Sequence, residues 1–411
     1  MWGDRGRCGA EERLADWAGP VSAGSSRNHF EELFNADAPE EAQLRAETLL
    51  EAAERLRDER MKVLGLCKSV DALVAQQSVT QELAAEAMAK VREAQQLCEE
   101  LGDFEEGEAA VSYASARCHL RYGGADEEMQ DKALEDGAEA AALCRLVGSK
   151  KGEAFSLLTV GDAYHQGKEA DKALEYHRSA AGVFKEIGDS GGSALAYRKV
   201  AEDFLKLKRD VKKATANAKR AISIFQEIQD PPAEANGWHL LAEIYVAEGD
   251  LANASECVTN ARSLCKSLKD HVAETKAMET LVAAFLENDQ FPEGIQVAKE
   301  IVSVHHKAND KEREGFALVS LAQHLLRLSD FRNAEKVSGA AEFIFRSIHE
   351  KEGVKMTQSL KEAAEHGLKA EHIQQAVAQR QEFLNLPQPL IIDPGRKTRM
   401  QEAFNEFAKS A

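Results

Sequence analysis

The stretch that decides the fold is NGWHLLAEIYVAEGDLANASECVTNARSLCKSLKD, residues 236–270. In its first half, apolar residues recur at positions i, i+3, i+4 and i+7: Trp238, Leu241, Ala242 and Tyr245. This spacing places them on one face of an α-helix. The first half therefore predicts an amphipathic helix whose apolar face forms part of a core.

The second half of the stretch repeats this pattern with smaller residues. A polar turn, Glu248-Gly249-Asp250, is followed by Ala254, Val258 and Ala261, which again share one helical face. Alanine at positions 254 and 261 leaves room for the large side chains of the first helix. The whole stretch predicts two close-packed antiparallel helices.

The same pattern recurs along the chain at a nearly fixed period. Seven segments end in a polar turn: LCEELGD (97–103), LCRLVGS (143–149), VFKEIGD (183–189), IFQEIQD (224–230), LCKSLKD (264–270), VHHKAND (304–310) and IFRSIHE (344–350). Their starts are 46, 40, 41, 40, 40 and 40 residues apart. A period of this length indicates an array of structural repeats.

Composition supports an all-α chain. Residues 40–230 contain no proline and are rich in Ala, Leu, Glu, Lys and Arg, the strong helix formers. One helix pair cannot bury its apolar face alone, so neighbouring pairs stack and form a continuous core. We therefore predict one elongated solenoid of helix pairs.

The repeated columns resemble the tetratricopeptide repeat (TPR) family. A second copy of the Trp–Leu–Ala–Tyr…Ala…Ala pattern reads Leu157, Val160, Gly161, Tyr164, Ala173 and Ala180. The resemblance covers roughly residues 75–350 and implies a TPR-type α-α superhelical solenoid of antiparallel helix pairs. Two features depart from the family: the period is about 40 rather than 34, and the proline that closes many repeats is missing. The longer period is most similar to kinesin light chains and to G-protein-signalling modulators with Leu-Gly-Asn repeats.

The array and its flanks suggest five parts of the chain. They are a disordered or locally helical leader (1–36), N-terminal helices with a first partial repeat (37–104), the helix-pair array (105–350), C-terminal capping helices (351–386) and a proline-containing basic tail with a short helix (387–411). We expect two helices over residues 353–385.

Residues 39–77 allow two interpretations. Leu49, Leu56, Val63 and Val70 recur every seven residues, as in a coiled coil. Arg60 at a seam position favours the alternative, one or two helices that pack as a cap on the array.

Charge and composition exclude several classes of function. With 52 Lys+Arg against 70 Asp+Glu, the formal charge is −18, which argues against nucleic acid or an anionic membrane as partner. No stretch approaches 18 consecutive apolar residues, and the cysteines show no CxxC pair. We expect a cytoplasmic protein without a membrane-spanning segment.

The sequence contains no pattern typical of an enzyme. GxxxxGK[ST], GxGxxG and HExxH are all absent, so we expect no catalysis and no cofactor. Adjacent residues such as His305 and His306 point about 100° apart on a helix, which disfavours a metal site. Cys98, Cys144 and Cys265 fall in one apolar column and are expected to be small buried residues.

The TPR resemblance implies that the first helix of each pair lines a concave groove that binds a peptide or helix of a partner protein. We predict ten groove residues: His119, Asp162, His165, Arg198, Glu202, His239, Glu243, Glu279, Gln323 and Arg327. The predicted repeat core includes Tyr164, Trp238, Leu241, Ala242, Tyr245, Ala254 and Ala261. The chain would then be a non-enzymatic interaction scaffold or adaptor. The alternative is a regulatory subunit like kinesin light chains or the G-protein-signalling modulators.

One basic cluster stands out in this acidic chain. It comprises Lys206, Lys208, Arg209, Lys212, Lys213, Lys219 and Arg220. An acidic partner segment is one interpretation of this cluster, and a solvated turn with an outer helix face is the other.

Overall fold

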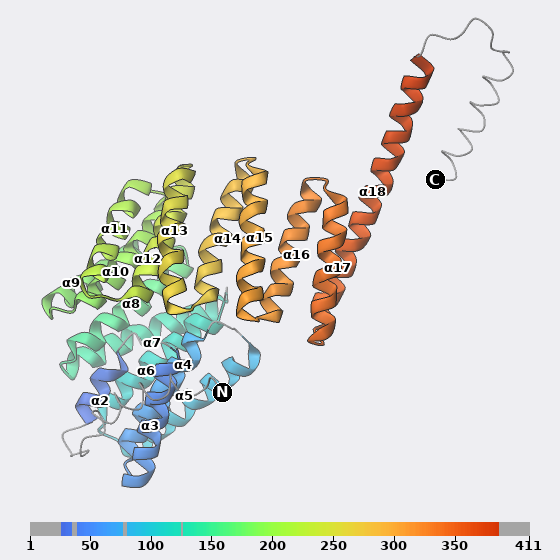
Figure 1. Cartoon of the computed structure of the whole chain (residues 1–411). Helices are drawn as coiled ribbons and strands as arrows, with labels where there is room; N and C mark the ends of the chain where they lie inside the picture. The colour runs from blue at the N-terminus through green and yellow to red at the C-terminus, as the bar shows by residue number, and fades with distance from the viewer. Residues whose placement is uncertain (1–25, 35–38, 77–79, 125, 386–411) are drawn as a thin grey trace, which may run out of the picture. The chain divides into compact units, whose positions relative to one another are not determined.

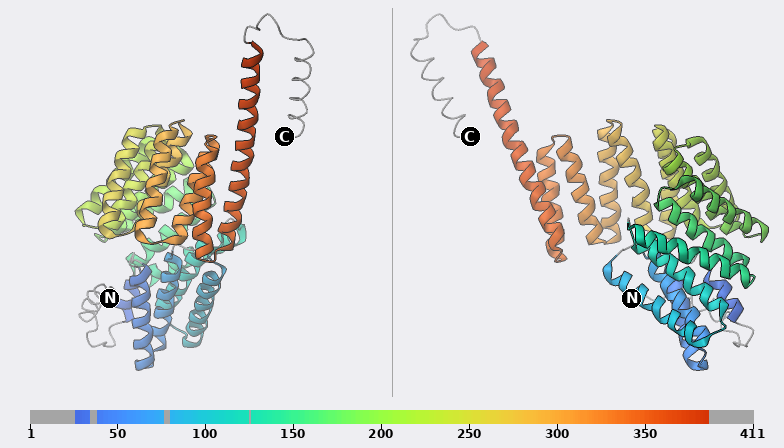
Figure 2. Two further views of the ribbon diagram at one scale, coloured as in Figure 1. Left: turned by 45° about the vertical axis from the view of Figure 1, so that its right-hand side comes forward. Right: turned by 180° about the vertical axis from the view of Figure 1, so that it is seen from behind.

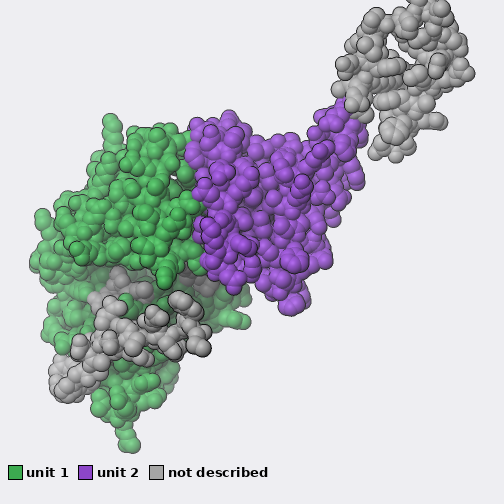
Figure 3. Space-filling view, in the orientation of Figure 1, with its two compact units in different colours: residues 1–281 green, residues 282–411 purple. Residues whose placement is uncertain are grey.

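The computed structural model describes residues 26–34, 39–76, 80–124 and 126–385, and every regular element in these ranges is a helix (Figure 1). The chain divides into two compact units, residues 1–281 and 282–411 (Figure 3). The division falls inside helix α14 (His271–Glu287). No helix in the described ranges is both long enough and apolar enough to span a membrane.

Unit 1 is built from antiparallel helix pairs. Its helices are α2 (Ser26–Leu33), α3 (Pro39–Leu56), α4 (Glu59–Ala75), α5 (Gln81–Leu101), α6 (Glu105–Tyr122), α7 (Glu127–Leu146), α8 (Lys150–Gln166), α9 (Ala170–Glu186), α10 (Ser190–Asp203), the π-helix η1 (Phe204–Lys208), α11 (Val211–Glu227), α12 (Pro231–Glu248) and α13 (Leu251–Leu268). The pairs α6/α7, α8/α9, α10/α11 and α12/α13 each pack along their length, and successive pairs stack. Unit 2 contains α15 (Phe291–Ala308), α16 (Lys311–Arg327), α17 (Phe331–Ser347) and α18 (Lys351–Asn385).

The polar turns that mark the period are helix starts. The carboxylate of Asp189 accepts a hydrogen bond from the amide of Gly192 at 2.8 Å, and Asp250 does the same for the amide of Asn253 at 3.1 Å. Such N-cap bonds satisfy amides that the first turn of a helix leaves free. The residue before the cap turns left-handed, with φ of 73° at Gly188. Glycine adopts this conformation without strain.

The alanine columns are confirmed as the contact between paired helices. Ala242 and Ala254 are fully buried, and Leu241 and Ala261 are nearly so. The three aromatic residues predicted for the core are only half-buried: Tyr164, Trp238 and Tyr245. The indole N–H of Trp238 donates to Glu234 at 3.0 Å on the helix surface, and the ring of Tyr164 stacks on Tyr176 at 5.4 Å. These three rings lie at the border between core and solvent, where the indole N–H of Trp238 keeps its partner.

Of the two alternatives for the leader over residues 1–36, the disordered one is wrong for residues 26–34, which form the helix α2 and its end. Phe30, Leu33 and Phe34 are all buried. Phe34 packs against Tyr113 of α6, with ring centroids 5.0 Å apart, and stacks on Phe155 of α8 at 6.4 Å. Apolar residues at i, i+3 and i+4 thus dock this short helix on the array. Residues 1–25 lie outside the described ranges, as does the predicted tail over residues 387–411.

The N-terminal region from residue 39 forms two helices, α3 and α4, which pack against each other in the same chain. A left-handed residue, Arg57 with φ 52°, separates them. Leu49, Val63 and Val70 are buried inside unit 1, whereas Leu56 is 54% exposed. Three of the four heptad residues therefore pack within one chain, and the choice between a cap and a coiled coil stays a prediction.

The expectation of two helices over residues 353–385 is wrong, because α18 is one continuous helix. Figure 2 shows that it runs well past α17. No proline or polar turn interrupts this span. Its two glycines serve close packing instead: a Cβ would lie 2.4 Å from the Phe345 ring at Gly353 and 2.2 Å from the Phe331 ring at Gly367.

Candidate partner-binding groove

The predicted groove residues lie on the first helices of the pairs, whose exposed side we call the first-helix face. Unit 1 holds eight of the ten: His119, Asp162, His165, Arg198, Glu202, His239, Glu243 and Glu279. All of these except the exposed Glu279 are half-buried. Gln323 and Arg327 are exposed on α16 in unit 2. Within unit 1, α6, α8, α10 and α12 lie next to one another, so most predicted residues share one face.

Beneath this face in unit 1 lies a buried carboxylate, Asp203 at the end of α10. Its two oxygens accept hydrogen bonds from two imidazoles: Oδ1 from Nδ1 of His165 and Oδ2 from Nδ1 of His177, both at 2.6 Å. Asp203 and His177 are fully buried. The three residues come from α8, α9 and α10, so one carboxylate joins three helices.

The buried imidazole of His177 is held in its charged form. Burial alone disfavours the imidazolium, but the hydrogen bonds that His177 donates to Asp162 and Asp203, together with the negative charges of these carboxylates, outweigh it and raise the pKa of His177 to about 9. Nε2 of His177 lies 3.4 Å from Oδ1 of Asp162. Burial tends to raise the pKa of Asp203, yet the bonds from both histidines hold it below its ordinary value.

The cluster continues toward the first-helix face through Asp162. Nζ of Lys199 lies 2.8 Å from Oδ1 of Asp162 and 3.9 Å from Glu202, which in turn pairs with Arg198. Despite burial, these cations keep the pKa of the Glu202 carboxyl below its ordinary value. We call His165, His177, Asp162, Asp203 and Lys199 the α8–α10 polar cluster.

Gly161 makes this cluster possible. A Cβ added there would lie 2.3 Å from the His177 ring, closer than side chains approach. Gly161 occupies the first-helix column that holds alanine at Ala201 and Ala242. Because Gly161 has no side chain, the imidazole of His177 can occupy the space next to its Cα.

The predicted residues of α12 are linked to α14 in the same unit. Nε2 of His239 lies 2.9 Å from the hydroxyl of Thr280 and 3.7 Å from the carboxylate of Glu243. Burial is the largest cause that lowers the pKa of His239, so it is neutral at pH 7. At the other end of the face, His119 lies 3.0 Å from Asp136 of α7.

A cavity of about 530 Å³ opens beside these residues in unit 1. Its walls include Asn236 and His239 of α12, Lys276 of α14, Arg121 of α6, and Gln76 just after α4. Residues 76 and 121 are far from residues 236–276 in sequence, so the stacking of the pairs brings distant first helices to one hollow. Its size is within the range of ligand pockets, about 300–1,000 Å³.

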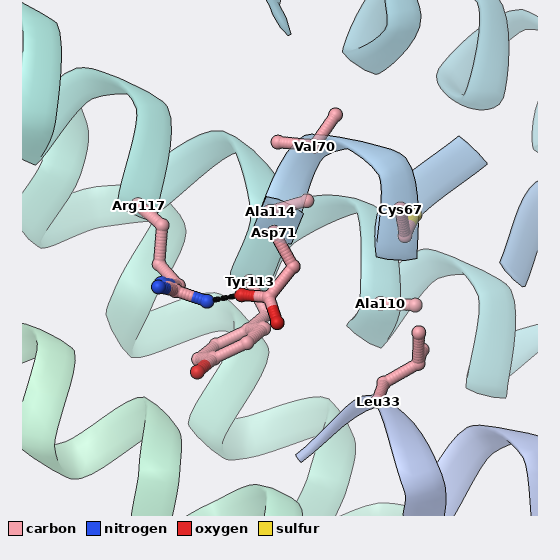
Figure 4. A pocket seen from close by; sticks show the side chains of 8 residues that line it. All are labelled: Leu33, Cys67, Val70, Asp71, Ala110, Tyr113, Ala114 and Arg117. Carbon is pink, nitrogen blue, oxygen red and sulfur yellow. Dashed lines mark ion pairs between the residues drawn. The ribbon is translucent and has the colours of Figure 1, made fainter. Parts of the chain in front are cut away.

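A second pocket, at the base of α2, is too small to be a ligand site. It measures about 10 Å³, roughly the space of one water molecule. Figure 4 shows the ion pair between Arg117 of α6 and Asp71 of α4 on its wall. Nζ of the buried Lys68 lies 3.3 Å from Asp71 and 3.5 Å from the carbonyl oxygen of Leu33, at the end of α2. These charges fasten α2 to the array.

Much of the basic 206–220 cluster is engaged within the chain. Lys208 pairs with Asp171 at 2.7 Å, Lys213 with Asp210 at 2.9 Å, and Arg220 lies 4.1 Å from the ring centre of Tyr197. Lys219 lies over the ring of Tyr245. The π-helix η1, which the sequence did not suggest, carries Lys206 and Lys208.

The histidines and cysteines that the sequence analysis considered for metal binding or chemistry differ in their surroundings. His305 is buried, whereas His306 is exposed and lies 2.7 Å from Glu314. Cys98, Cys144 and Cys265 are buried, which confirms the prediction for that column. Burial raises the pKa of the Cys265 thiol to about 11, so it is protonated at neutral pH.

Sequence reasoning missed Lys199, His177 and Asp203. The signal was present in the repeat columns. Asp203 stands where other copies have Ala163, Ile244 and Ala284, and His177 stands where they have Gly137, Ala218 and Val258. A charged residue in each of two adjoining apolar columns points to a buried pair.

The comparisons with known proteins concern structure alone. A Rap protein, solved in complex with competence and sporulation factor, aligns with a TM-score of 0.52 at 11% identity, over 84% of this chain and 98% of that one. The apo quorum sensor NprR from B. thuringiensis has a TM-score of 0.47 at 10% identity, over 82% and 98%. A Podosopora anserina putative kinesin light chain with nearly identical TPR-like repeats has a TM-score of 0.40 at 15% identity, over 49% and 97%.

The fold is an all-α solenoid of stacked helix pairs, similar to that of the solved Rap protein. The sequence matches no protein-family model and no curated protein. The stacking of the helix pairs explains why the predicted residues share a face: each first helix contributes the same positions, one repeat apart. Identities of 10–15% carry no specific partner from these structures to this chain.

Proposed function

We propose that this protein is a non-enzymatic, cytoplasmic interaction scaffold or adaptor that holds an extended or helical segment of a partner protein on the first-helix face of unit 1. The observation that carries the proposal is the cavity between α12, α14 and the ends of α4 and α6. It adjoins a strip of half-buried polar residues, Arg198, Glu202, His239 and Glu243, of which His239 lines the cavity itself. A hollow with ordered polar groups along its edge is typical of a binding site.

The order of these polar groups supports binding rather than catalysis. Arg198 is held by Glu202, and Glu202 by Lys199, which is in turn fixed by Asp162 of the polar cluster. Side chains that are already ordered lose little conformational freedom when a ligand binds. The solved Rap protein complex has the same fold and holds a factor, so the fold is compatible with such a role.

The test is a charge reversal on the first-helix face. Partners captured by the full wild-type chain should bind the double variant Arg198→Glu, Glu243→Arg at least about tenfold more weakly. The reason is that changing a partly desolvated charge in an interface raises the dissociation rate. Far-UV circular dichroism should be unchanged.

The matched control reverses two charges on α9, Glu175→Lys with Lys185→Glu, both of which are exposed. This variant should bind as the wild type does. If both double variants bind equally well, the partner uses another surface and the proposal fails.

A further inference from the structure

Unit 2 contains a hollow of its own, formed by the first turns of α15 and α17 and the last turn of α16. Its volume is about 550 Å³, within the range of ligand pockets, about 300–1,000 Å³. Most of the residues that line it are apolar: Phe291, Pro292, Ile295, Leu325, Leu328 and Val337. We call it the α15–α17 hollow.

The packing of the helix pairs does not require all of these apolar residues. Leu328 stands where other repeats have Lys208 and Glu248, and Ile295 stands where another repeat has Ser255. Polar residues therefore suffice at these positions in unit 1. Leu328 is half-buried, so part of its apolar surface remains in contact with water. A further apolar group in the hollow would remove that surface from water, which is favourable.

The wall of the hollow carries one charge of each sign, whereas the chain beside it is acidic. Lys299 and Asp330 both line the hollow, and Asp330 also caps α17 by accepting a hydrogen bond from the amide of Asn333 at 3.3 Å. Exposed acids gather in residues 287–293, which contain no Lys or Arg: Glu287, Asp289 and Glu293. An occupant with an apolar face next to basic residues would match both features.

The tail of this chain has such a pattern. Residues 396–399 read RKTR and are followed by Met400, Phe404 and Phe407, spaced i, i+4 and i+7. This spacing predicts a short helix with one apolar face. The two glutamates within the same span fall on the opposite face of such a helix. The basic residues would therefore lie directly beside the apolar face.

The tail is also long enough to reach the hollow from the end of α18. A Cβ at Gly367 of α18 would lie 2.2 Å from the ring of Phe331, the residue after Asp330 of the wall. Beyond Gly367, α18 extends about 27 Å further to Asn385, at about 1.5 Å per residue (Figure 2). The 18 residues from 386 to 403 can span up to about 60 Å. This length covers the return and leaves about 30 Å to pass round the start of α17.

We propose that the α15–α17 hollow is the docking site of the tail of the same chain. The apolar face of residues 400–407 enters the hollow with Phe404 at its centre, and residues 396–399 lie against the acids of residues 287–293. The contact closes the hollow to other apolar ligands. The inference concerns unit 2 and does not depend on the proposed function of the first-helix face.

The test is photo-cross-linking in the full-length protein, with p-benzoylphenylalanine in place of Phe404 and peptide mapping of the products. Cross-links should form within one chain, to peptides from residues 291–299 or 325–337. Cross-links that map elsewhere in the chain, or that join two chains, overturn the inference.

A substitution in the wall tests the hollow itself. Leu328→Glu should lose these cross-links, because a carboxylate replaces part of the apolar wall. Its far-UV circular dichroism should match that of the wild type, since Glu248 occupies the same position in another repeat. The matched control Ile228→Glu changes an apolar side chain that is 39% exposed in unit 1, and it should keep the cross-links. If Leu328→Glu keeps them too, the hollow does not hold the tail and the inference fails.

A competition experiment gives a second readout, with a synthetic peptide of residues 394–411. The peptide should bind the full-length double variant Phe404→Asp, Phe407→Asp at least about tenfold more tightly than the wild type, whose own tail competes at high effective concentration. Equal binding to the two proteins, or binding to neither, contradicts the proposed docking. The proposed function is tested separately at Arg198 and Glu243, so its failure is distinguishable from the failure of this inference.

Discussion

Replacement of Asp203 by Asn is the sharpest test of the α8–α10 polar cluster. The carboxylate is fully buried and accepts hydrogen bonds from His165 and His177, each at 2.6 Å. Asparagine has almost the same shape but no charge, and its amide nitrogen would face one imidazole with a donor opposite a donor. The substitution therefore removes electrostatic stabilisation with little change in packing volume.

The magnitude follows from the charged state of His177. Raising its pKa from 6.5 to about 9 corresponds to about 3 kcal/mol in favour of the imidazolium, shared between Asp203 and Asp162. Breaking one side of a buried pair typically costs about 3–5 kcal/mol. We expect Asp203→Asn to lower the free energy of unfolding at pH 7 by about 3 kcal/mol, measured by urea denaturation followed by circular dichroism.

The pH dependence gives a second readout with a definite sign. A group whose pKa is higher in the folded chain stabilises fully below its unfolded value, and this stabilisation is lost as pH rises through the folded value. His177 therefore stabilises the wild type below about pH 6.5, and this contribution disappears as the pH reaches about 9. The difference between wild type and Asp203→Asn should shrink across this window.

A matched control is Asp171→Asn, which removes an exposed carboxylate that pairs with Lys208. Exposed ion pairs contribute little, so this variant should unfold within about 1 kcal/mol of the wild type. If Asp203→Asn also unfolds within that margin, or if its difference from wild type does not depend on pH between 6.5 and 9, the buried ion pair as we describe it is refuted.

Two further substitutions test packing by thermal or urea unfolding. Gly161→Ala should lower the free energy of unfolding by about 1–3 kcal/mol, because its Cβ would lie 2.3 Å from the His177 ring. The control Gly182→Ala in α9, where no atom lies within 4 Å of the added Cβ, should be neutral or stabilising. Equal effects of the two substitutions would show that His177 has room to move. Phe34→Ala should lower the free energy of unfolding by about 3–5 kcal/mol, because it removes a buried side chain that anchors α2. The control Phe343→Ala, at a ring that is 76% exposed, should change it little. A small effect of Phe34→Ala would mean that α2 is not docked.

The repeat array could be predicted because its determinants are local. Helical spacing, alanine columns and an Asp at the start of the next helix recur about every 40 residues, and each has a meaning within a single pair. Asp189 and Asp250 appear in the sequence as turn residues, and in the structure they cap the following helices. These helix and turn patterns can be recognised in a single sequence because they do not depend on contacts between residues that are far apart in the chain.

The features that escaped prediction depend on contacts between elements. Phe30 and Phe34 lie in a polar leader, and only the rings of Tyr113 and Phe155 reveal why that segment is helical. Gly353 and Gly367 suggest helix breaks in a sequence, but both accommodate aromatic rings of α17. The π-helix at Phe204–Lys208 follows no residue pattern that distinguishes it from an α-helix.

The polar cluster connects the fold of unit 1 to its proposed role. A buried imidazolium with two carboxylates costs desolvation, and apolar residues in the same columns would stabilise the array without that cost. The charged residues instead fix the orientation of side chains. Asp203 holds His165, and Asp162 holds Lys199. Lys199 in turn aligns Glu202 and Arg198 on the first-helix face. Because the cluster fixes these side chains in advance, a partner on the proposed binding face would meet charges that are already oriented. The charged residues in the core and those on the first-helix face would thus act together in binding.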